Sequence, residues 1–171
     1  MSSRTLPIIV LASTSIYRRE LLGRIYQDFQ VESPNVDETP LPNEDARVCA
    51  ERLSIAKARA ITSLSGKDFI IGSDQVAECD GVRLSKPGSL DKAIEQLKFA
   101  SGRTAFFYTG VCVLNAHTNV HQSVVVDTEV TFRQLSLSEI ERYVEAEDVL
   151  GFWGRTTSKR LGIHPAAGSH G

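Results

Sequence analysis

The sequence contains few cysteines, and their spacing suggests neither a metal site nor a disulfide framework. Only Cys49, Cys79 and Cys112 occur in 171 residues, and no two of them form a Cys-x-x-Cys pair. Their odd number and wide separation are typical of reduced thiols, which persist in a cytosol. The cysteine pattern therefore argues against zinc modules and small disulfide-bonded secreted folds, and we expect a cytoplasmic protein.

Long apolar runs are also absent. The apolar stretch at 7–12 is far shorter than the roughly 20 residues that a membrane-spanning helix requires. It also lacks the length and the small-residue cleavage pattern of a secretory signal peptide. We therefore expect neither a membrane association nor a cleaved leader.

The charges show no excess of one sign. Nineteen Lys and Arg residues stand against 21 Asp and Glu residues, which gives a net charge of −2 and a pI near 6.1. A general nucleic-acid binder has a basic face or a high pI, so we expect no nucleic-acid partner and only a local cationic site. Hydrophobic residues make up 42% of the chain and charged residues 23%. These values are ordinary for a globular protein, and the length suits one domain.

The sequence does contain an irregular mixture of short apolar strands and amphipathic helices. Apolar and β-branched runs predict strands at 69–72 and at 7–12, 29–33, 105–114 and 120–132, the last two forming a long hairpin. Apolar residues at intervals of three or four positions predict helices, the clearest at 44–64 and others at 16–25, 89–100 and 136–147. We therefore expect an α/β or α+β domain built around a mixed sheet.

Local signals mark the ends of some of these elements. Asp80-Gly81 is a sequence typical of a tight hairpin turn. Ser136 and Glu139 are spaced as a capping box at the start of the helix at 136–147.

A first candidate site lies at the start of the helix at 16–25. Ser13 and Ser15 precede it as candidate caps, and Arg18 and Arg19 fall in its first turns. Cations near the positive end of a helix dipole cost about a few tenths of a kcal/mol each. They become favourable if an anion binds there to backbone N–H groups, hydroxyls and guanidinium groups. Two solvated arginines are the alternative. Tyr17 beside them either packs in a core or interface, or stacks on a base.

Acidic side chains supply two more candidates. Glu38 follows Asp37 in a proline-bounded loop, where carboxylates suit Mg²⁺ or merely occupy a turn. Asp74 and Gln75 follow the strand predicted at 69–72, the position at which open α/β sheets place their ligands. Asp74 can orient or deprotonate a water, or hold a metal, in a phosphoryl substitution. An aspartate after a strand is also a common turn former.

Two lysines complete the candidates. Lys57 lies beside the apolar positions Ala56 and Ala60 of the helix predicted at 44–64, and Lys86 precedes Pro87. Each lysine can reach a phosphate. The alternative for Lys57 is an alkyl chain that packs on apolar surface while its ammonium reaches solvent.

These candidates belong to an ordered series of motifs. The stretches LASTS-x-x-RRELL, VDETP, ERLSIAKARA, IIGSDQV, SKP, ASGRTAFFYTG and TFRQLSLSEIERYV follow one another through most of the chain. In this order they resemble the Maf family of nucleotide pyrophosphatases. The resemblance implies a single elongated α/β domain at 1–150, with a central twisted mixed sheet flanked by helices, similar to the inosine-triphosphate pyrophosphatases. It also implies a cytoplasmic, commonly homodimeric enzyme that needs Mg²⁺ or Mn²⁺ and cuts a nucleoside triphosphate to its monophosphate and pyrophosphate.

The resemblance further implies roles for individual residues. Asp74 matches the catalytic aspartate, the general base for the water that attacks the α-phosphorus. Glu38 matches the loop acid, which we expect to position the metal or the water. The phosphate-binding positions are Ser13, Arg18, Arg19, Lys57 and Lys86. We expect Ser15, Tyr17 and Gln75 to contact the substrate as well.

Two residues indicate a subgroup of the family. Members that cleave dTTP or UTP tend to carry Asp-Thr where this chain carries Asp74-Gln75, and Tyr17 resembles the subgroup that hydrolyses 7-methyl-GTP. An electron-poor methylated guanine should stack well on an aromatic ring. We therefore expect 7-methyl-GTP as the substrate. The alternatives are a dTTP or UTP pyrophosphatase and a catalytically impaired, nucleotide-binding regulatory protein linked to cell division.

The chain departs from the family pattern at two places. Ile16 stands where the family usually has Pro, which leaves the helix start less preorganised. After Leu150 the family motifs are only faintly present, and the position of the specificity-setting Glu falls near Lys159. We interpret 151–171 as an atypical, truncated C-terminal tail of the same domain, with a reading-frame change in the gene as one hypothesis. That hypothesis predicts altered base recognition, and resequencing the locus tests it.

Overall fold

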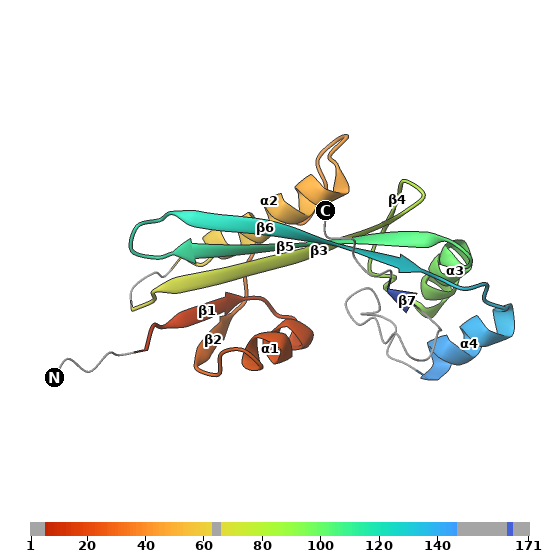
Figure 1. Ribbon diagram of the computed structural model, residues 1–171, viewed down its shortest axis with the longest axis horizontal. Helices are drawn as coiled ribbons and strands as arrows, with labels where there is room; N and C mark the ends of the chain where they lie inside the picture. The colour runs from red at the N-terminus through yellow and green to blue at the C-terminus, as the bar shows by residue number, and fades with distance from the viewer. Residues whose placement is uncertain (1–5, 63–65, 147–163, 166–171) are drawn as a thin grey trace. The chain divides into compact units, whose positions relative to one another are not determined.

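The structure is a computed structural model that describes residues 6–62 and 66–146 and the backbone of 164–165. Figure 1 shows its helices and strands. The strands are β1 Ile9–Ala12, β2 Phe29–Glu32, β3 Phe69–Cys79, β4 Val82–Leu84, β5 Thr104–Asn115, β6 His121–Thr131 and β7 His164–Pro165. The helices are α1 Ile16–Gly23, α2 Ala46–Arg59, α3 Leu90–Ala100 and α4 Leu137–Ala146. Within these described residues, no helix has both the length and the apolar character needed to cross a membrane.

The described strands form one mixed sheet. Its order is β2-β1-β3-β5-β6-β7, and β4 pairs with β3. Strand β1 runs parallel to both neighbours, with Leu11 opposite Val31 on β2 and opposite Ile71 on β3. Strand β4 is antiparallel to β3, and β7 is antiparallel to β6. The prediction of a mixed α/β sheet is therefore confirmed.

The chain divides into two compact units. The first comprises Met1–Asp74 and Thr109–Val125, and the second comprises Gln75–Tyr108 and Val126–Gly171. Strands β3, β5 and β6 pass from one unit into the other. The expected division into a domain at 1–150 and an atypical tail at 151–171 stays a prediction, because most of that tail lies outside the described residues.

In the first unit, α2 packs closely on the sheet. Its core cluster consists of Val10, Ala12, Ala58, Ile61, Ile70, Cys112 and Leu114. A Cβ added to Gly72 on β3 would overlap the backbone carbonyl oxygen of Ser54 and lie 2.6 Å from the backbone nitrogen of Ala58. A glycine is needed at this position because the helix backbone approaches the strand so closely. This contact holds Lys57, which precedes Ala58, against the strand that carries Asp74.

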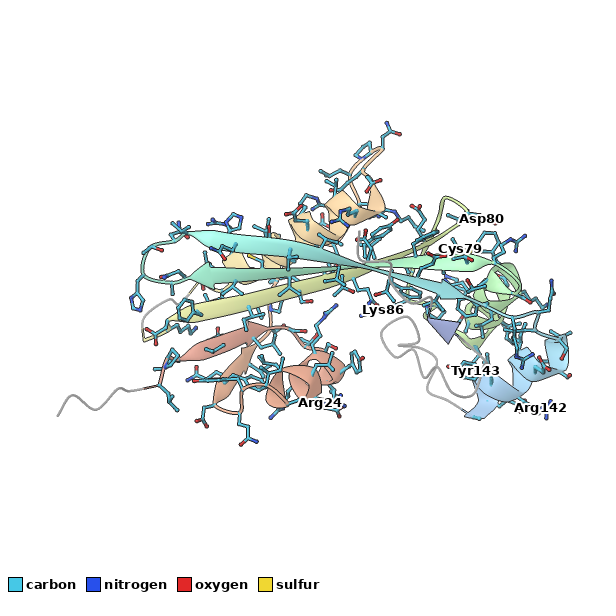
Figure 2. All side chains as sticks on the ribbon, in the orientation of Figure 1. Arg24, Cys79, Asp80, Lys86, Arg142 and Tyr143 are labelled. Atoms are coloured by element: carbon cyan, nitrogen blue, oxygen red, sulfur yellow. The ribbon has the colours of Figure 1, made fainter. Side chains whose placement is uncertain are left out.

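The second unit has a larger apolar core, formed by strand residues and by α3 and α4. Its buried residues are Ala77, Cys79, Leu84, Ala93, Leu97, Ala100, Ala105, Phe107, Val130, Phe132, Ile140, Tyr143 and Val144. Figure 2 shows Tyr143 on α4, and Cys79 and Asp80 where β3 turns into β4. Asp80 and Gly81 both have positive φ angles, +48° and +74°, as a two-residue hairpin turn requires. The hairpin turn predicted at these residues is confirmed.

The boundary predicted for the third strand is wrong, and the error affects the candidate site. Strand β3 does not stop at Gly72 but continues to Cys79, so Asp74 and Gln75 lie inside a strand. Asp74 is buried, as is Ser73 before it, and Gln75 is exposed. The polar run Ser73-Asp74-Gln75 indicated the end of a strand because buried strands rarely carry two consecutive polar residues on their path.

Candidate functional site

The candidate site is centred on the ammonium group of Lys57. Its Nζ lies 2.7 Å from Asp74 Oδ1 and 2.7 Å from Glu38 Oε1. The side chains of Lys57 and Asp74 are only 8% and 10% exposed, whereas that of Glu38 is 57% exposed. One cation therefore joins a buried carboxylate to a carboxylate that is open to solvent.

Three different elements of the first unit supply these groups. Lys57 lies near the C-terminal end of α2, Asp74 lies in β3, and Glu38 lies in the loop between β2 and α2. Removing a charge from water is costly, and an ion pair compensates for that cost only with good geometry. Buried charged groups of this kind often mark functional sites, although structural ion pairs also occur.

Arg18 brings a second cation toward the same carboxylates. It is half-buried in the first turn of α1. Burial lowers the pKa of its guanidinium, and the negative charges of Asp74 and Glu38 act in the opposite direction. The two acids and two cations therefore form one electrostatic cluster.

The residues before α1 are ordered by hydrogen bonds among themselves. Ser15 is the N-cap, and its hydroxyl oxygen accepts a hydrogen bond from the backbone N–H of Arg18 at 3.3 Å. The hydroxyl oxygen of Ser13, which is buried, accepts one from the N–H of Ser15 at 3.1 Å. The capping role predicted for this segment is confirmed at Ser15. The other N–H groups of the first turn point along the helix axis toward its N-terminus, where anions bind favourably.

Arg19 and Tyr17 have different surroundings from Arg18. Arg19 is exposed and borders an open hollow of about 450 Å³, whose lining residues are Ile16, Arg19, Glu20, Gly23, Gln27 and Phe29. Tyr17 is 42% exposed on α1. Successive residues of a helix point in directions about 100° apart, so the side chains of Arg18 and Arg19 leave α1 in different directions. The phosphate-binding role of Arg19 and the base-stacking role of Tyr17 both stay predictions.

The remaining candidates lie in the second unit or outside the described residues. Gln75 begins the second unit directly after Asp74, and Lys86 is exposed in the segment after β4 (Figure 2). Their contribution to a site with Asp74 stays a prediction. Lys159, near which the family's specificity-setting Glu would fall, lies outside the described residues.

Two residues next to the candidate site, Arg52 and Glu44, were not predicted from the sequence. Arg52 on α2 forms an ion pair with Glu44, with its Nε 2.5 Å from Glu44 Oε1. The Glu44 side chain is only 5% exposed, and the hydrogen bond from Arg52 is the main cause that lowers its pKa to about 2. Glu44 begins the helix predicted at 44–64 and Arg52 lies in the stretch ERLSIAKARA, but nothing in the sequence indicates that the two residues pair.

The carboxylates present fit a divalent metal. No group of three or more His, Cys, Asp and Glu side chains that could hold a metal occurs in the described part of the chain. Asp74 and Glu38 nevertheless converge on one cation, Lys57, and both offer hard oxygen donors. Mg²⁺ commonly binds through one or two carboxylates together with substrate phosphates, which is the donor set that these two residues and a nucleotide would provide.

Comparison with solved structures finds likenesses at low sequence identity. A Ham1 protein from Staphylococcus aureus is 18% identical, with a TM-score of 0.49 over 73% of this chain and 71% of the other. A nucleoside-triphosphatase, described as a dITP/XTP pyrophosphatase, from Mycobacterium abscessus is 15% identical. Its TM-score is 0.45, over 73% of this chain and 72% of the other.

Comparison with curated proteins finds much closer sequences. A protein of Polaromonas sp. (strain JS666) is 46% identical over 91% of this chain and 71% of its own length. A protein of Cupriavidus pinatubonensis is 45% identical over 95% of this chain and 82% of its own length. Both carry the name 7-methyl-GTP pyrophosphatase. The family model described as "Maf-like protein" matches residues 8–164. The motifs, the relatives and this match agree, and the chain belongs to the Maf family.

Proposed function

We propose that this protein hydrolyses a nucleoside triphosphate to the monophosphate and pyrophosphate, and that its substrate is 7-methyl-GTP. The observation that carries the proposal is the cluster of Lys57, Asp74 and Glu38 with Arg18 beside it. Phosphoryl transfer depends mainly on positioning and on neutralising phosphate charge. Two cations and two carboxylates at one place supply both requirements.

The phosphates bind at the cationic side of this cluster. An ammonium group has three N–H donors, and Glu38 and Asp74 use two of those on Lys57. The third donates to a phosphate oxygen, and Arg18 adds its planar guanidinium group. Ser13, Ser15 and the N–H groups at the start of α1 extend the anion site, because a helix N-terminus attracts negative charge. The family resemblance supports Arg19 and Lys86 as further phosphate-binding residues.

Asp74 acts as the general base. It accepts a proton from water while the water oxygen forms a bond to the α-phosphorus. The bond from that phosphorus to the bridging oxygen breaks, and pyrophosphate leaves with the electron pair. A buried carboxylate held by Lys57 has a fixed position for this proton transfer, which typically contributes a factor of about 10² to 10⁴ in rate. Glu38, with the substrate phosphates, would hold Mg²⁺ or Mn²⁺, which would neutralise developing charge on the phosphate oxygens.

The base is recognised at Tyr17. Its ring is partly exposed on α1, the same helix whose start binds the phosphates. The methylated guanine of 7-methyl-GTP carries a positive charge, which favours stacking on an aromatic face. The names of the Polaromonas and Cupriavidus relatives support the same substrate. Gln75 contacts the substrate as the residue that distinguishes this chain from the dTTP and UTP subgroup.

Two expectations about the protein as a whole accompany this proposal. The family resemblance suggests a homodimer, which light scattering on the purified protein tests. The free and buried thiols of Cys49, Cys79 and Cys112 are compatible with the reducing conditions of a cytoplasm, and fractionation of cells tests that location.

The test is pyrophosphate release from 7-methyl-GTP, GTP, dTTP and UTP, each with Mg²⁺, with Mn²⁺ and with a chelator. We expect rapid release from 7-methyl-GTP with either metal and none with the chelator. Asp74→Asn should lower kcat by a factor of about 10² to 10⁴. Asp28→Asn makes the same chemical change at an exposed position of the first unit and should leave kcat unchanged.

Other outcomes distinguish the alternatives. Preferred release from dTTP or UTP would retain the pyrophosphatase and overturn the roles of Tyr17 and Gln75. Nucleotide-dependent thermal stabilisation without release, in the wild-type protein, would favour the regulatory nucleotide-binding protein. Equal activity of the Asp74→Asn and Asp28→Asn variants would remove Asp74 from the mechanism.

A further inference from the structure

The loop that carries Glu38 is attached to α2 through one arginine. Arg52 Nη2 donates to the backbone carbonyl oxygen of Thr39, the residue after Glu38, at 3.3 Å. The same side chain donates from Nε and Nη2 to the two carboxylate oxygens of Glu44, at 2.5 and 2.9 Å. One guanidinium therefore binds the loop at two points, Thr39 and Glu44.

Glu44 also forms hydrogen bonds to Leu41 within the loop. Its Oε2 accepts a hydrogen bond from the backbone N–H of Leu41 at 3.0 Å, and its own N–H donates to the carbonyl oxygen of Leu41 at 3.1 Å. Since this carboxylate is almost fully buried against Arg52, the pair is a charge-assisted contact of the stronger kind.

The residues on either side of Glu38 form a tight turn. Asp37 Oδ1 accepts hydrogen bonds from the backbone N–H of Thr39 at 2.9 Å and from the Thr39 hydroxyl at 2.6 Å. An aspartate bonded to the backbone two residues later forms a local turn that fixes the residue between them. The turn thus constrains the backbone at Glu38, and Arg52 holds the turn through the Thr39 carbonyl.

We infer that Arg52, through Thr39 and Glu44, is a positioning residue for Glu38. Arg52 and Lys57 lie on the same helix, α2. The helix that provides the cation for the Glu38 carboxylate therefore also provides the anchor for the loop. This inference rests on the proposed function, in which Glu38 serves the reaction, but the geometry of the loop can be tested without any nucleotide.

The first experiment measures amide hydrogen exchange of the free protein. Arg52→Lys retains the charge but cannot hold Thr39 and both Glu44 oxygens at once. We expect exchange at the Thr39 and Leu41 amides to rise by about tenfold or more, with β1 and the interior of α2 unchanged. Arg133→Lys is the matched control, because Arg133 pairs with Glu139 at 2.8 Å in the second unit. It should leave the loop amides unchanged.

The second experiment is a double-mutant cycle on hydrolysis. Arg52→Lys should lower kcat by about 5- to 30-fold, with KM changed much less. If Arg52 acts through Glu38, the same substitution should have almost no further effect on kcat in a Glu38→Gln background. A merely structural role would instead give the same loss in both backgrounds.

A third variant tests the same inference if Arg52→Lys fails to fold. Asp37 is exposed, so Asp37→Ala removes the turn without disturbing a core. It should raise exchange at Thr39 and should also be non-additive with Glu38→Gln. Unchanged loop exchange in both variants, or additive losses of kcat in both cycles, would overturn the inference. Absence of turnover in the wild-type protein would count against the proposed function, and exchange alone would then decide whether Arg52 holds the loop.

Discussion

The two units of the chain bury different kinds of side chain. Among the described residues, those of polar or charged type that are buried as whole residues all lie in the first unit, and they are Ser13, Ser54, Lys57, Lys67, Ser73 and Asp74. The side chain of Glu44, in the same unit, is 5% exposed. The core cluster of the second unit consists of apolar and aromatic residues. Burying charge lowers stability unless the charge is paired. The buried ionic groups of the first unit include those of the candidate site, whereas the described core cluster of the second unit is stabilised by apolar packing.

The first and last described helices show the same difference. Helix α4 buries Ile140, Tyr143 and Val144 against its unit. Helix α1 buries no residue, and Ile16 is 75% exposed. A helix of eight residues is marginal by itself in water, so α1 depends on its cap and on the chain around it. The exposed start of α1 is accessible to a ligand, and phosphate binding is the role proposed for it.

The largest effect should come from removing the buried ammonium of the first unit. Lys57→Met leaves the Asp74 carboxylate buried without its partner, and breaking a buried pair in this way costs about 3–5 kcal/mol. We expect the free energy of unfolding at pH 7, measured with urea, to fall by this amount, and nucleotide hydrolysis to be lost. Lys98→Met, on an exposed position of α3, is the control and should stay within about 0.5 kcal/mol of the wild type.

A similar unfolding free energy for Lys57→Met and Lys98→Met would contradict this expectation. It would mean that the Asp74 carboxylate is hydrated or partnered some other way once Lys57 is gone. The buried ion pair of the first unit would then contribute little to the free energy of unfolding.

A cavity in the second unit should affect stability alone. Leu97 on α3 is 1% exposed, and Leu97→Ala should lower the free energy of unfolding by about 2–5 kcal/mol. Because Leu97 belongs to the apolar core cluster of the second unit and carries no group proposed for the reaction, kcat per folded molecule should be unchanged below the unfolding temperature. Leu90→Ala, which is exposed on the same helix, should change neither quantity. A loss of kcat in folded Leu97→Ala would contradict this prediction, because it would show that the core of the second unit affects catalysis.

The second unit contains the part of β3 after Asp74 that the sequence did not predict, but its hairpin turn and its capped helix were predicted. Their signals are local, as with the Asp80-Gly81 turn and the cap of α4, where the Ser136 hydroxyl accepts from the Glu139 N–H and the Glu139 carboxylate accepts from the Ser136 N–H. Such motifs depend on residues three or fewer positions apart. Local hydrogen-bonding chemistry is therefore enough to locate them.

The candidate site was predictable only in part. Motif resemblance pointed to Asp74, Lys57 and Glu38, and the structure brings these three together. Their shared contact does not follow from periodicity, because it depends on α2 packing against the strand at Gly72. The extension of β3 past Asp74 does not follow either, because that part of the strand pairs with β4. Arg52 was missed because its partners in the loop are 8 and 13 residues away.

The ion pair behind the Glu38 loop should make the first unit more sensitive to acid. Arg52 lowers the pKa of Glu44 from 4.5 to about 2, chiefly through its hydrogen bond. A depressed pKa in the folded state contributes stability above pH 4.5, and this contribution is lost as the pH falls from 4.5 through about 2. The stability advantage of the wild type over Glu44→Gln should therefore shrink across this window.

The matched pair in the second unit sharpens this prediction. The hydrogen bond from Arg133 also lowers the pKa of Glu139, but that side chain is 34% exposed against 5% for Glu44. Solvent weakens exposed ion pairs, so Glu139→Gln should show a smaller change over the same pH range. Urea unfolding of both variants between pH 7 and 2 measures the difference. An equal response would show that burial of Glu44 does not strengthen its pair.

The smallest effects should come from the two serine caps. Ser15 caps α1 in the first unit, and Ser136 belongs to the capping box of α4 in the second. Replacing either by Ala removes one hydrogen bond to a helix N–H, which costs about 1 kcal/mol. The effect on the free energy of unfolding should therefore be similar at both positions.

The caps should differ in their effect on the substrate. Ser15→Ala alters the helix start that is proposed to bind phosphate, and KM for the nucleotide should rise several-fold. Ser136→Ala leaves that site untouched and should leave KM unchanged. Thermal unfolding and steady-state kinetics on both variants separate the two contributions, because a general loss of stability would appear in both proteins. If Ser136→Ala raised KM as much as Ser15→Ala, substrate affinity would depend on overall stability. The proposal that the start of α1 binds phosphate would then be contradicted.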